Sequence, residues 1–415
     1  MISLPLRPYE TDMAKLLNIP ASQMRLAQWR QESFNYTYYP ATPPPAPGVG
    51  YFLQLSSPIN ITIQGDPPPA DRPFAIALQP GWNLVGVPFN QPIPVNSLQV
   101  VHQFSAPVSW ETATESIGGE PALVGRNVWT LGSFGTYVQA TQLEPGRAYW
   151  IRVLRPEGVT LLVPPPTGST GRTARAATTP AWAMDLILQS PVGGGVATIG
   201  IDPAARTRGY AYNHDAPPAL PGMSAFGILD DAGQRLLQSV KPPSGRQAWT
   251  LQVAPAEPSR EHTLTWRIPT TTPKRWRITL ENPTTGERVD MRLREFYRFT
   301  PAEAQTLRVI VEPSVAAPVR ITNLAATVSR GGQATLQFQL TGEATLRAEI
   351  RTARGETVRV LTPSRATGAG MQSLTWNGRD ANERALPPGT YMAYIEAIDS
   401  DGRVARATTP ILLTR

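Results

Sequence analysis

Acidic side chains with the spacing of metal ligands lie in loops of this chain. Asp399 and Asp401 alternate as in a calcium-binding loop, but no Glu follows at the twelfth position, which favours a hairpin turn. Asp215 follows Asn213 and His214 and precedes two prolines, where an Asx turn is favoured over a bound Ca²⁺ or sugar hydroxyl. We therefore predict no metal site and no cofactor, with Ca²⁺ at Asp215, Asp399 or Asp401 as the alternative.

Groups that could carry out catalysis are scattered or missing. His102, His214 and His262 lie in three different segments, whereas a histidine metal site usually needs two or more histidines with carboxylate support. The chain has no Cys, which excludes a thiolate nucleophile and Cys-ligated zinc. No Gly-x-Ser-x-Gly elbow occurs, and residues 193–195 lack the Lys-Ser/Thr of a phosphate loop. We predict no catalytic residue and a protein that is not an enzyme, with a carboxylate pair for glycoside hydrolysis as the remaining alternative.

Aromatic side chains that could bind a ligand cluster near residue 36. They are Phe34, Tyr36, Tyr38 and Tyr39. Most of the ten Trp residues instead lie on the apolar face of an alternating strand, where a core position is expected. Exposed aromatic rings can form a sugar platform or a protein interface. Loss of a neighbouring strand could create the same exposure, so both interpretations stay open.

The charge pattern argues against a nucleic-acid partner. The formal net charge is +7, and all but three of the 38 basic residues are Arg, without any block of five or six. No run of 18 apolar residues occurs, so no transmembrane segment is predicted. The expected partners are therefore a protein or a glycan.

A duplicated pattern sets the elements of the N-terminal half. Met1–Leu6 aligns with Leu84–Phe89, Pro47–Leu55 with Pro145–Val153, a strand Ile59–Ile63 with Val159–Val163, and Trp29 with Trp129. Two copies predict tandem small β-modules. The first copy lacks the Gly-Trp-Asn that precedes Leu84. We therefore expect the chain to start inside a module, as the C-terminal part of a longer polypeptide whose signal peptide was lost with the missing N-terminus.

Proline and glycine punctuate short alternating segments along the whole chain. We predict an all-β fold with a truncated module at 1–66, a complete module at 75–166, a linker at 167–180, a β-sandwich at 181–314 and a last sandwich at 316–415. One helix is expected at Thr11–Ile19, with Thr11 or Asp12 as N-cap. Alternation of apolar residues is clear around Trp249, Leu264 and Trp276.

The last domain carries a recognisable motif. Residues 373–382 read Ser-Leu-Thr-Trp-Asn-Gly-Arg-Asp-Ala-Asn, and Leu-Pro-Pro-Gly-Thr-Tyr follows at 386–391. This pattern resembles the Ig-like domain of the flagellar hook-capping (FlgD) family, which recurs at the C-terminus of bacterial secreted and surface proteins. Glu383 departs from the family pattern, which usually has Gly there. The Trp-Asn-Leu and Pro-Gly-x-x-Tyr-Trp motifs of the N-terminal half resemble repeats of large bacterial cell-surface proteins.

Both resemblances imply an extracellular or cell-surface location and no catalytic residues. The expected function is that of a non-catalytic modular protein that serves in adhesion, scaffolding or anchoring. A carbohydrate-binding protein is the first alternative, and a flagellar hook assembly protein is the second.

Overall fold

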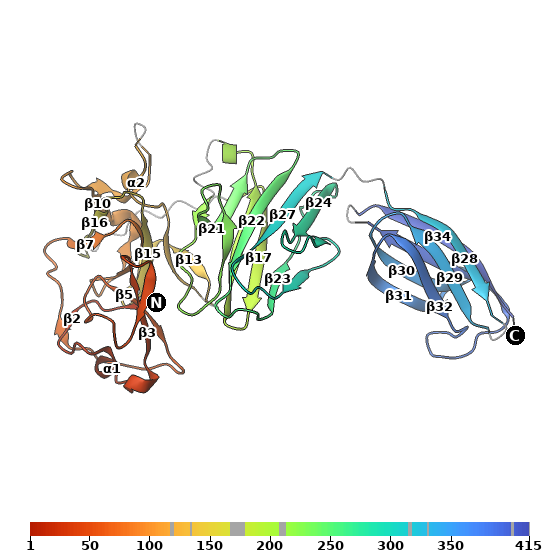
Figure 1. Cartoon of the computed structure of the whole chain (residues 1–415), viewed down its shortest axis with the longest axis horizontal. Helices are drawn as coiled ribbons and strands as arrows, with labels where there is room; N and C mark the ends of the chain where they lie inside the picture. The colour runs from red at the N-terminus through yellow and green to blue at the C-terminus, as the bar shows by residue number, and fades with distance from the viewer. Residues whose placement is uncertain are drawn as a thin grey trace.

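The computed structural model describes residues 1–116, 120–132, 135–166, 179–206, 213–313, 318–329, 332–399 and 402–414 (Figure 1). Regular structure in these residues is almost entirely β, which confirms the predicted all-β class. The two α-helices, α1 (Met13–Leu16) and α2 (Trp110–Ala113), each make one turn. None of the described helices has the length and hydrophobicity needed to cross a membrane.

The first sheet has the strand order β1-β5-β3-β4. Its strands are β1 (Ile2–Ser3), β5 (Gly50–Gln54), β3 (Arg25–Arg30) and β4 (Asn35–Tyr38). Side chains of α1 and of the strands form one core that includes Leu4, Met13, Leu17, Leu26 and Tyr51. Asp12 caps α1 by accepting hydrogen bonds from the backbone of Ala14 and Lys15. The helix ends at Leu16, earlier than the predicted Ile19, because Asn18 adopts a positive φ of 51°.

The second module packs two four-stranded sheets face to face. One has the order β13-β12-β15-β8, with β13 (Tyr137–Ala140), β12 (Val128–Leu131), β15 (Ala148–Val153) and β8 (Gly81–Gly86). The other has the order β11-β10-β16-β7, with β11 (Val108–Ser109), β10 (Gln99–Val101), β16 (Val159–Val163) and β7 (Phe74–Leu78). Short pairs β2 (Arg7–Pro8) with β6 (Gly65–Asp66) and β9 (Ile93–Pro94) with β14 (Gln142–Leu143) complete this half, together with the 3₁₀ turns η1 (Ala21–Gln23) and η2 (Val95–Ser97).

The predicted strand Val159–Val163 is β16, whereas the predicted strand Ile59–Ile63 is wrong. Within the described residues, 59–63 pair with no strand, and Ile59 and Ile61 are 39% and 40% exposed. β16 forms because β7 and β10 flank it and bury its apolar face. The first sheet offers residues 59–63 no such flanking strands.

The first sheet and the β8 sheet share their strand order and register. Ile2 and Ser3 pair with Tyr51 and Gly50, as Val85 and Gly86 pair with Tyr149 and Ala148. Farther along, Ala27 lies opposite Phe52, and Trp129 lies opposite Trp150. The cross-strand register therefore makes Ala27 the counterpart of Trp129, and the predicted correspondence of Trp29 with Trp129 is off by two residues. A two-residue shift keeps side chains on the same face, which is why the sequence pattern concealed it.

These two sheets contact each other through equivalent residues. An isolated bridge joins Ile2 to Arg147, and a second joins Val49 to Val85. Ser3 N donates to Gly146 O over 2.9 Å, and Gly86 N donates to Gly48 O over 2.9 Å. The register makes Ile2 and Ser3 the counterparts of Val85 and Gly86. Exchanging the two sheets therefore turns the first bridge into the second, and the first hydrogen bond into the second. The two sheets therefore pair about a local pseudo-twofold axis, as in an isologous dimer within one chain.

A single eleven-stranded sheet follows, in the order β25-β24-β27-β22-β20-β21-β18-β17-β23-β26, with β19 paired to β21. Its strands are β17 (Trp182–Ser190), β18 (Gly193–Ile201), β19 (His214–Asp215), β20 (Ala225–Leu229), β21 (Arg235–Lys241), β22 (Gln247–Ala254), β23 (His262–Trp266), β24 (Trp276–Glu281), β25 (Arg288–Asp290), β26 (Phe296–Phe299) and β27 (Gln305–Pro313). Ile278 of β24 and Leu264 of β23 belong to one buried core although their strands lie near opposite ends of this order. The sheet therefore bends over itself into a sandwich.

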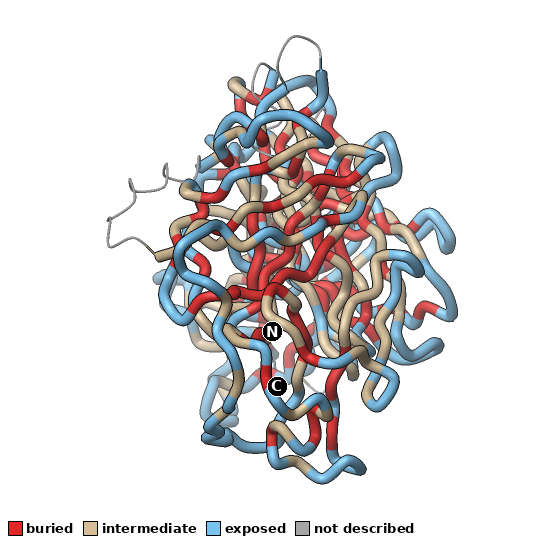
Figure 2. The backbone as a smooth tube through the Cα atoms, turned by 90° about the vertical axis from the view of Figure 1, so that its left-hand side faces the viewer, coloured by how far each residue is buried: buried red, intermediate tan, exposed pale blue. Residues whose placement is uncertain are grey.

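The last unit packs a three-stranded sheet, β28 (Ile321–Val328), β29 (Ala334–Leu340) and β32 (Gly370–Trp376), on a four-stranded one. The second sheet contains β31 (Thr357–Thr367), β30 (Ala344–Thr352), β33 (Gly389–Ile398) and β34 (Val404–Leu413). The two sheets bury Phe338, Ile350 and Trp376 between them. In Figure 1 this unit lies beyond the end of the sandwich, and residues of both, including Arg277 and Arg403, line a common pocket. Figure 2 shows buried residues concentrated inside the packed sheets.

Candidate functional site

The predicted aromatic cluster divides among three environments. Tyr36 is half-buried, and its hydroxyl donates to Ala219 O over 2.7 Å. Tyr39 donates instead to the carboxylate of Asp12, at 3.2 Å from Oδ1. Phe34 and Tyr38 are 69% and 52% exposed. Because Tyr36 and Tyr39 have intramolecular partners, the four residues do not form one exposed platform.

Tyr36 has a counterpart in the second module that the sequence did not single out. The register places Tyr137 at the equivalent position, since Tyr36 pairs with Trp29 and Tyr137 pairs with Leu131. The Tyr137 hydroxyl donates to Pro218 O over 2.8 Å, next to the carbonyl that Tyr36 contacts. Two pseudo-equivalent tyrosines thus hold two consecutive carbonyls of one segment. We refer to Tyr36, Tyr137 and residues 217–220 as the tyrosine clamp.

An aromatic cluster supports the clamp from the module side. The Trp150 ring, fully buried, lies 5.4 Å from Trp29 and 6.2 Å from Trp82, both nearly edge-on. Trp150 Nε1 also donates to the Tyr137 hydroxyl over 3.1 Å. Leu220 and Leu237 of the sandwich pack against the same cluster. The contact between the module pair and the sandwich therefore includes an apolar part, and the tyrosine hydrogen bonds lie beside it.

The clamp tyrosines stay uncharged at ordinary pH. Burial raises the pKa of both Tyr36 and Tyr137 well above the usual range. Burial also lowers the pKa of Arg235, whose guanidinium lies near both hydroxyls and donates to Pro217 O over 3.3 Å. Neutral tyrosines keep their hydroxyl protons, so both can act as donors to the backbone carbonyls.

The candidate metal ligands are engaged by arginines. Asp215 Oδ2 accepts from Arg152 Nη1 at 2.7 Å, and Asp399 Oδ2 accepts from Arg403 Nε at 2.7 Å. Asp401 lies outside the described residues. No group of three or more His, Asp or Glu side chains suited to a metal ion occurs in the part of the chain that the structure describes. The two described carboxylates thus serve ion pairs, and the Arg152–Asp215 pair joins the second module to the sandwich.

A polar cleft of about 600 Å³ opens beside the clamp. Its walls come from the second module and from the sandwich, and they include the indoles of Trp82 and Trp129, the Arg152–Asp215 ion pair, Asn127 and Asp230. Trp129 is buried and lies edge-on to His214, with ring centroids 5.8 Å apart. No local sequence pattern indicates this cleft, because its walls come from two separate parts of the chain, between residues 82 and 154 and between residues 213 and 236, which the clamp holds together.

A serine and a histidine approach each other inside the sandwich. Ser224 Oγ lies 3.2 Å from His262 Nε2, and His262 Nδ1 lies 3.0 Å from Arg260 O. Ser224 is 3% exposed and His262 is 1% exposed. Ser224 Oγ also accepts a hydrogen bond from Ala256 N. A hydroxyl that is buried and already hydrogen-bonded in this way serves packing, because no substrate carbonyl can reach it.

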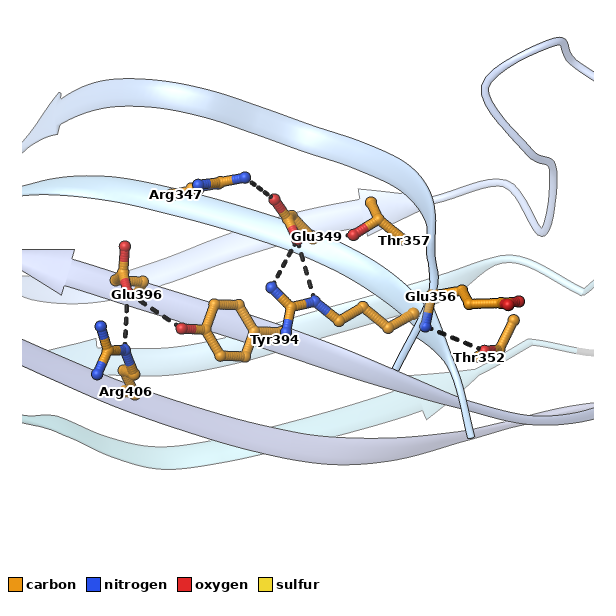
Figure 3. A network of polar contacts seen from close by, with 9 residues as sticks. Arg347, Glu349, Thr352, Glu356, Thr357, Tyr394, Glu396 and Arg406 are labelled. Atoms are coloured by element: carbon orange, nitrogen blue, oxygen red, sulfur yellow. Dashed lines mark hydrogen bonds and ion pairs between the residues drawn. The ribbon is translucent and has the colours of Figure 1, made fainter. Parts of the chain in front are cut away.

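A charged network lies on β30, β31, β33 and β34 of the last unit (Figure 3). Glu349, 1% exposed, accepts hydrogen bonds from Arg351 Nη2 over 2.8 Å and from Thr357 Oγ1 over 3.0 Å, and it also pairs with Arg347. Burial alone would raise the pKa of Glu349, but these donors outweigh it and hold the pKa below its ordinary value. The Arg351 guanidinium lies 3.8 Å from the centroid of the Tyr394 ring. The network is satisfied internally and holds neighbouring strands together.

Comparisons with known proteins give one family match, which lies in the last unit. Residues 325–401 match the model of the FlgD Ig-like domain family, which confirms the predicted resemblance. No curated protein matches the chain. The resemblance of the N-terminal half to surface-protein repeats was not found by these comparisons and stays a prediction.

Solved structures give only distant similarities. The glycoside hydrolase domain of Endo-D from Streptococcus pneumoniae R6 is 12% identical over 46% of this chain and 35% of that chain, with a TM-score of 0.19. Lactobacillus rhamnosus β-glucuronidase is 11% identical over 38% of this chain and 36% of that chain, with a TM-score of 0.16. A tetra-tandem repeat in the extending region of a large adhesion protein is 10% identical over 81% of this chain and 96% of that chain, with a TM-score of 0.20. The chain spans about a third of the length of the first two proteins. At these TM-scores, none of the three similarities supports an activity.

Proposed function

We propose that this chain is a non-catalytic structural segment of a bacterial cell-surface or secreted protein, in which it acts as a scaffold or anchoring spacer for adhesion. The tyrosine clamp is the observation that carries this proposal. Pseudo-equivalent tyrosines and a tryptophan cluster fix two paired modules onto the eleven-stranded sandwich. A spacer that transmits force between neighbouring modules needs such a contact, since independently moving modules would yield at their linkers.

The polar groups of the described residues support the same proposal. The carboxylates considered as metal ligands form ion pairs, and the serine–histidine pair is buried. The match to the FlgD Ig-like domain adds support for an exported protein, because the sequence resemblance implies a domain common at the C-termini of such proteins. That match covers residues 325–401 only, so a role in flagellar hook assembly has no support from the other sheets.

Protease shaving of intact source cells tests the proposal. Trypsin added to whole cells should release peptides of the sandwich and the last unit, which carry most of the arginines, before any peptide of a cytosolic marker protein appears. The secreted fraction should be analysed in parallel by mass spectrometry. Recovery of the chain exclusively from the cell interior, with no peptide released by shaving, would overturn the surface location.

A further inference from the structure

The cleft beside the tyrosine clamp has a composition that suits a particular ligand class. Its walls combine the residues Trp82 and Trp129 with several hydrogen-bonding groups. The Arg152 guanidinium donates, the carboxylates of Asp215 and Asp230 accept, and the Asn127 amide can do both. The volume of about 600 Å³ lies in the range of small-molecule sites, which typically occupy about 300–1,000 Å³. Junctions between domains are also a common place for such sites.

The charges in the cleft argue against an anionic ligand. Arg152 is neutralised by Asp215 at 2.7 Å, and Asp230 adds a further negative charge to the wall. Glu115 and Arg126 also line the cleft, so that three carboxylates stand against two guanidinium groups and a phosphate or carboxylate would enter a wall of net negative charge. The wall therefore suits a ligand without negative charge, and its mixture of donors and acceptors suits hydroxyl groups, which both donate and accept.

Asp230 is the group best placed to receive such a hydroxyl. Its Oδ1 accepts the backbone N–H groups of Ala232 and Gln234 at 3.0 and 2.7 Å, which fixes the carboxylate on its turn. Among the hydrogen bonds of the described residues, none reaches Oδ2. The carboxylate is only partly exposed, so a hydroxyl bound there would be held in a defined direction.

We propose that this cleft binds a neutral oligosaccharide. Asp230 and Asn127 would hold sugar hydroxyls, the Arg152–Asp215 pair would offer a donor and an acceptor side by side, and the partly exposed Trp82 ring would contact the apolar face of a sugar ring. Because both walls are needed, binding depends on the clamp that holds them together. This inference stands apart from the surface location proposed above, since a sugar site can exist in either compartment.

Calorimetric titration of the full chain tests the site. The probes are cellotriose, maltotriose, chitotriose and mannotriose, with inorganic phosphate as the anionic comparison. At least one trisaccharide should bind with a dissociation constant in the millimolar range or below, and it should change tryptophan fluorescence. Asp230→Asn and Asn127→Ala should each weaken that binding about ten-fold or more, as expected for loss of a hydrogen bond to a charged or buried group.

Asp231→Asn is the matched control, because it removes the adjacent charge in the same turn without lining the cleft. It should leave the affinity unchanged. Circular dichroism of each variant checks that Asp230→Asn, which keeps the side-chain acceptor for the turn, is folded. The proposal is overturned if no trisaccharide binds, if phosphate binds in their place, or if binding persists unchanged in both cleft variants.

Discussion

At the scale of single residues, the hydroxyls of Tyr36 and Tyr137 decide how firmly the modules hold the sandwich. Each donates to a carbonyl of residues 218–219 at 2.7–2.8 Å. Tyr36→Phe and Tyr137→Phe should each lower the free energy of unfolding by about 1–2 kcal/mol, because each leaves a partly buried carbonyl without its donor. Since both hydroxyls bind one segment, the double variant should deviate from additivity.

Urea unfolding followed by tryptophan fluorescence measures this effect, with Tyr38→Phe as the control. Tyr38 is 52% exposed and lies two residues from Tyr36 on the same strand. Its substitution should leave the stability unchanged within about 0.5 kcal/mol. Equal stability of Tyr36→Phe, Tyr137→Phe and Tyr38→Phe would show that the clamp hydrogen bonds do not form in solution.

The sequence singled out Tyr36 as a possible ligand-binding residue but did not indicate that its hydroxyl binds Ala219 O, and it did not single out Tyr137. Both partner carbonyls lie far away in the chain, 183 residues from Tyr36 and 81 residues from Tyr137. A local pattern of aromatic residues cannot reveal such a contact. The signal that could have found Tyr137 is the register of the duplicated strands, which requires knowing which residues face each other.

Glu349 links residue chemistry to the pH dependence of the last unit. Its pKa in the folded protein is held below the ordinary value of 4.5, because the hydrogen bonds from Arg351, Thr357 and Arg347 outweigh the effect of burial. A lowered folded-state pKa means that the carboxylate contributes stability above the unfolded value of 4.5. That contribution should be lost as pH falls through the folded pKa.

Glu349→Gln should lower the free energy of unfolding of the last unit by about 1–3 kcal/mol at pH 7. It should also make the decrease of that free energy below pH 4.5 less steep. Glu356→Gln is the control, since this exposed residue contributes its backbone N–H to Thr352 in Figure 3. Thermal melts between pH 3 and pH 7, at about half-unit steps, distinguish the two variants. If the melting temperature of Glu349→Gln depended on pH as that of the unmodified chain does, Glu349 would not contribute to the pH dependence of stability.

At the scale of elements, Gly86 allows the edges of two modules to approach. A Cβ atom at residue 86 would lie 2.4 Å from Val49 O and 2.7 Å from Ser3 Cβ. Gly86→Ala should therefore cost about 1–3 kcal/mol or more, because the obstacle is backbone that cannot rotate away. Gly245→Ala is a control in open space, where no atom lies within 4 Å of the new Cβ. Comparable denaturation midpoints for the two variants would contradict the close contact between the module edges.

Strand prediction succeeded where alternation and neighbours agree. The alternating residues around Trp249 and Trp276 became β22 and β24, which both pair with β27. Ile59–Ile63 alternates apolar and polar residues in the same way but has no flanking strands, so its apolar side chains remain partly exposed. Pattern alone identifies a segment that can pair, and the presence of a partner decides whether it does.

At the scale of the whole molecule, buried clusters determine which parts should unfold together. One cluster joins Ala27 and Phe52 of the first sheet to Leu84 and Trp150 of the second. The clusters of the last unit contain only residues between Val319 and Leu413. The sequence predicted consecutive modules but could not predict this shared core, because the pseudo-twofold pairing depends on backbone contacts between residues such as Ser3 and Gly146.

Scanning calorimetry of the full chain should therefore resolve at least two transitions. Trp150→Phe should lower the transition of the paired modules and leave that of the last unit in place, because the fully buried Trp150 ring contacts both modules and the clamp. Trp376→Phe should do the reverse, since Trp376 is 2% exposed within a core confined to the last unit. Conservative replacements lose less than the roughly 3–5 kcal/mol of a Trp→Ala change, which keeps both variants folded. If either substitution moved both transitions by the same amount, the chain would unfold as one cooperative unit. The last unit would then not unfold independently of the paired modules.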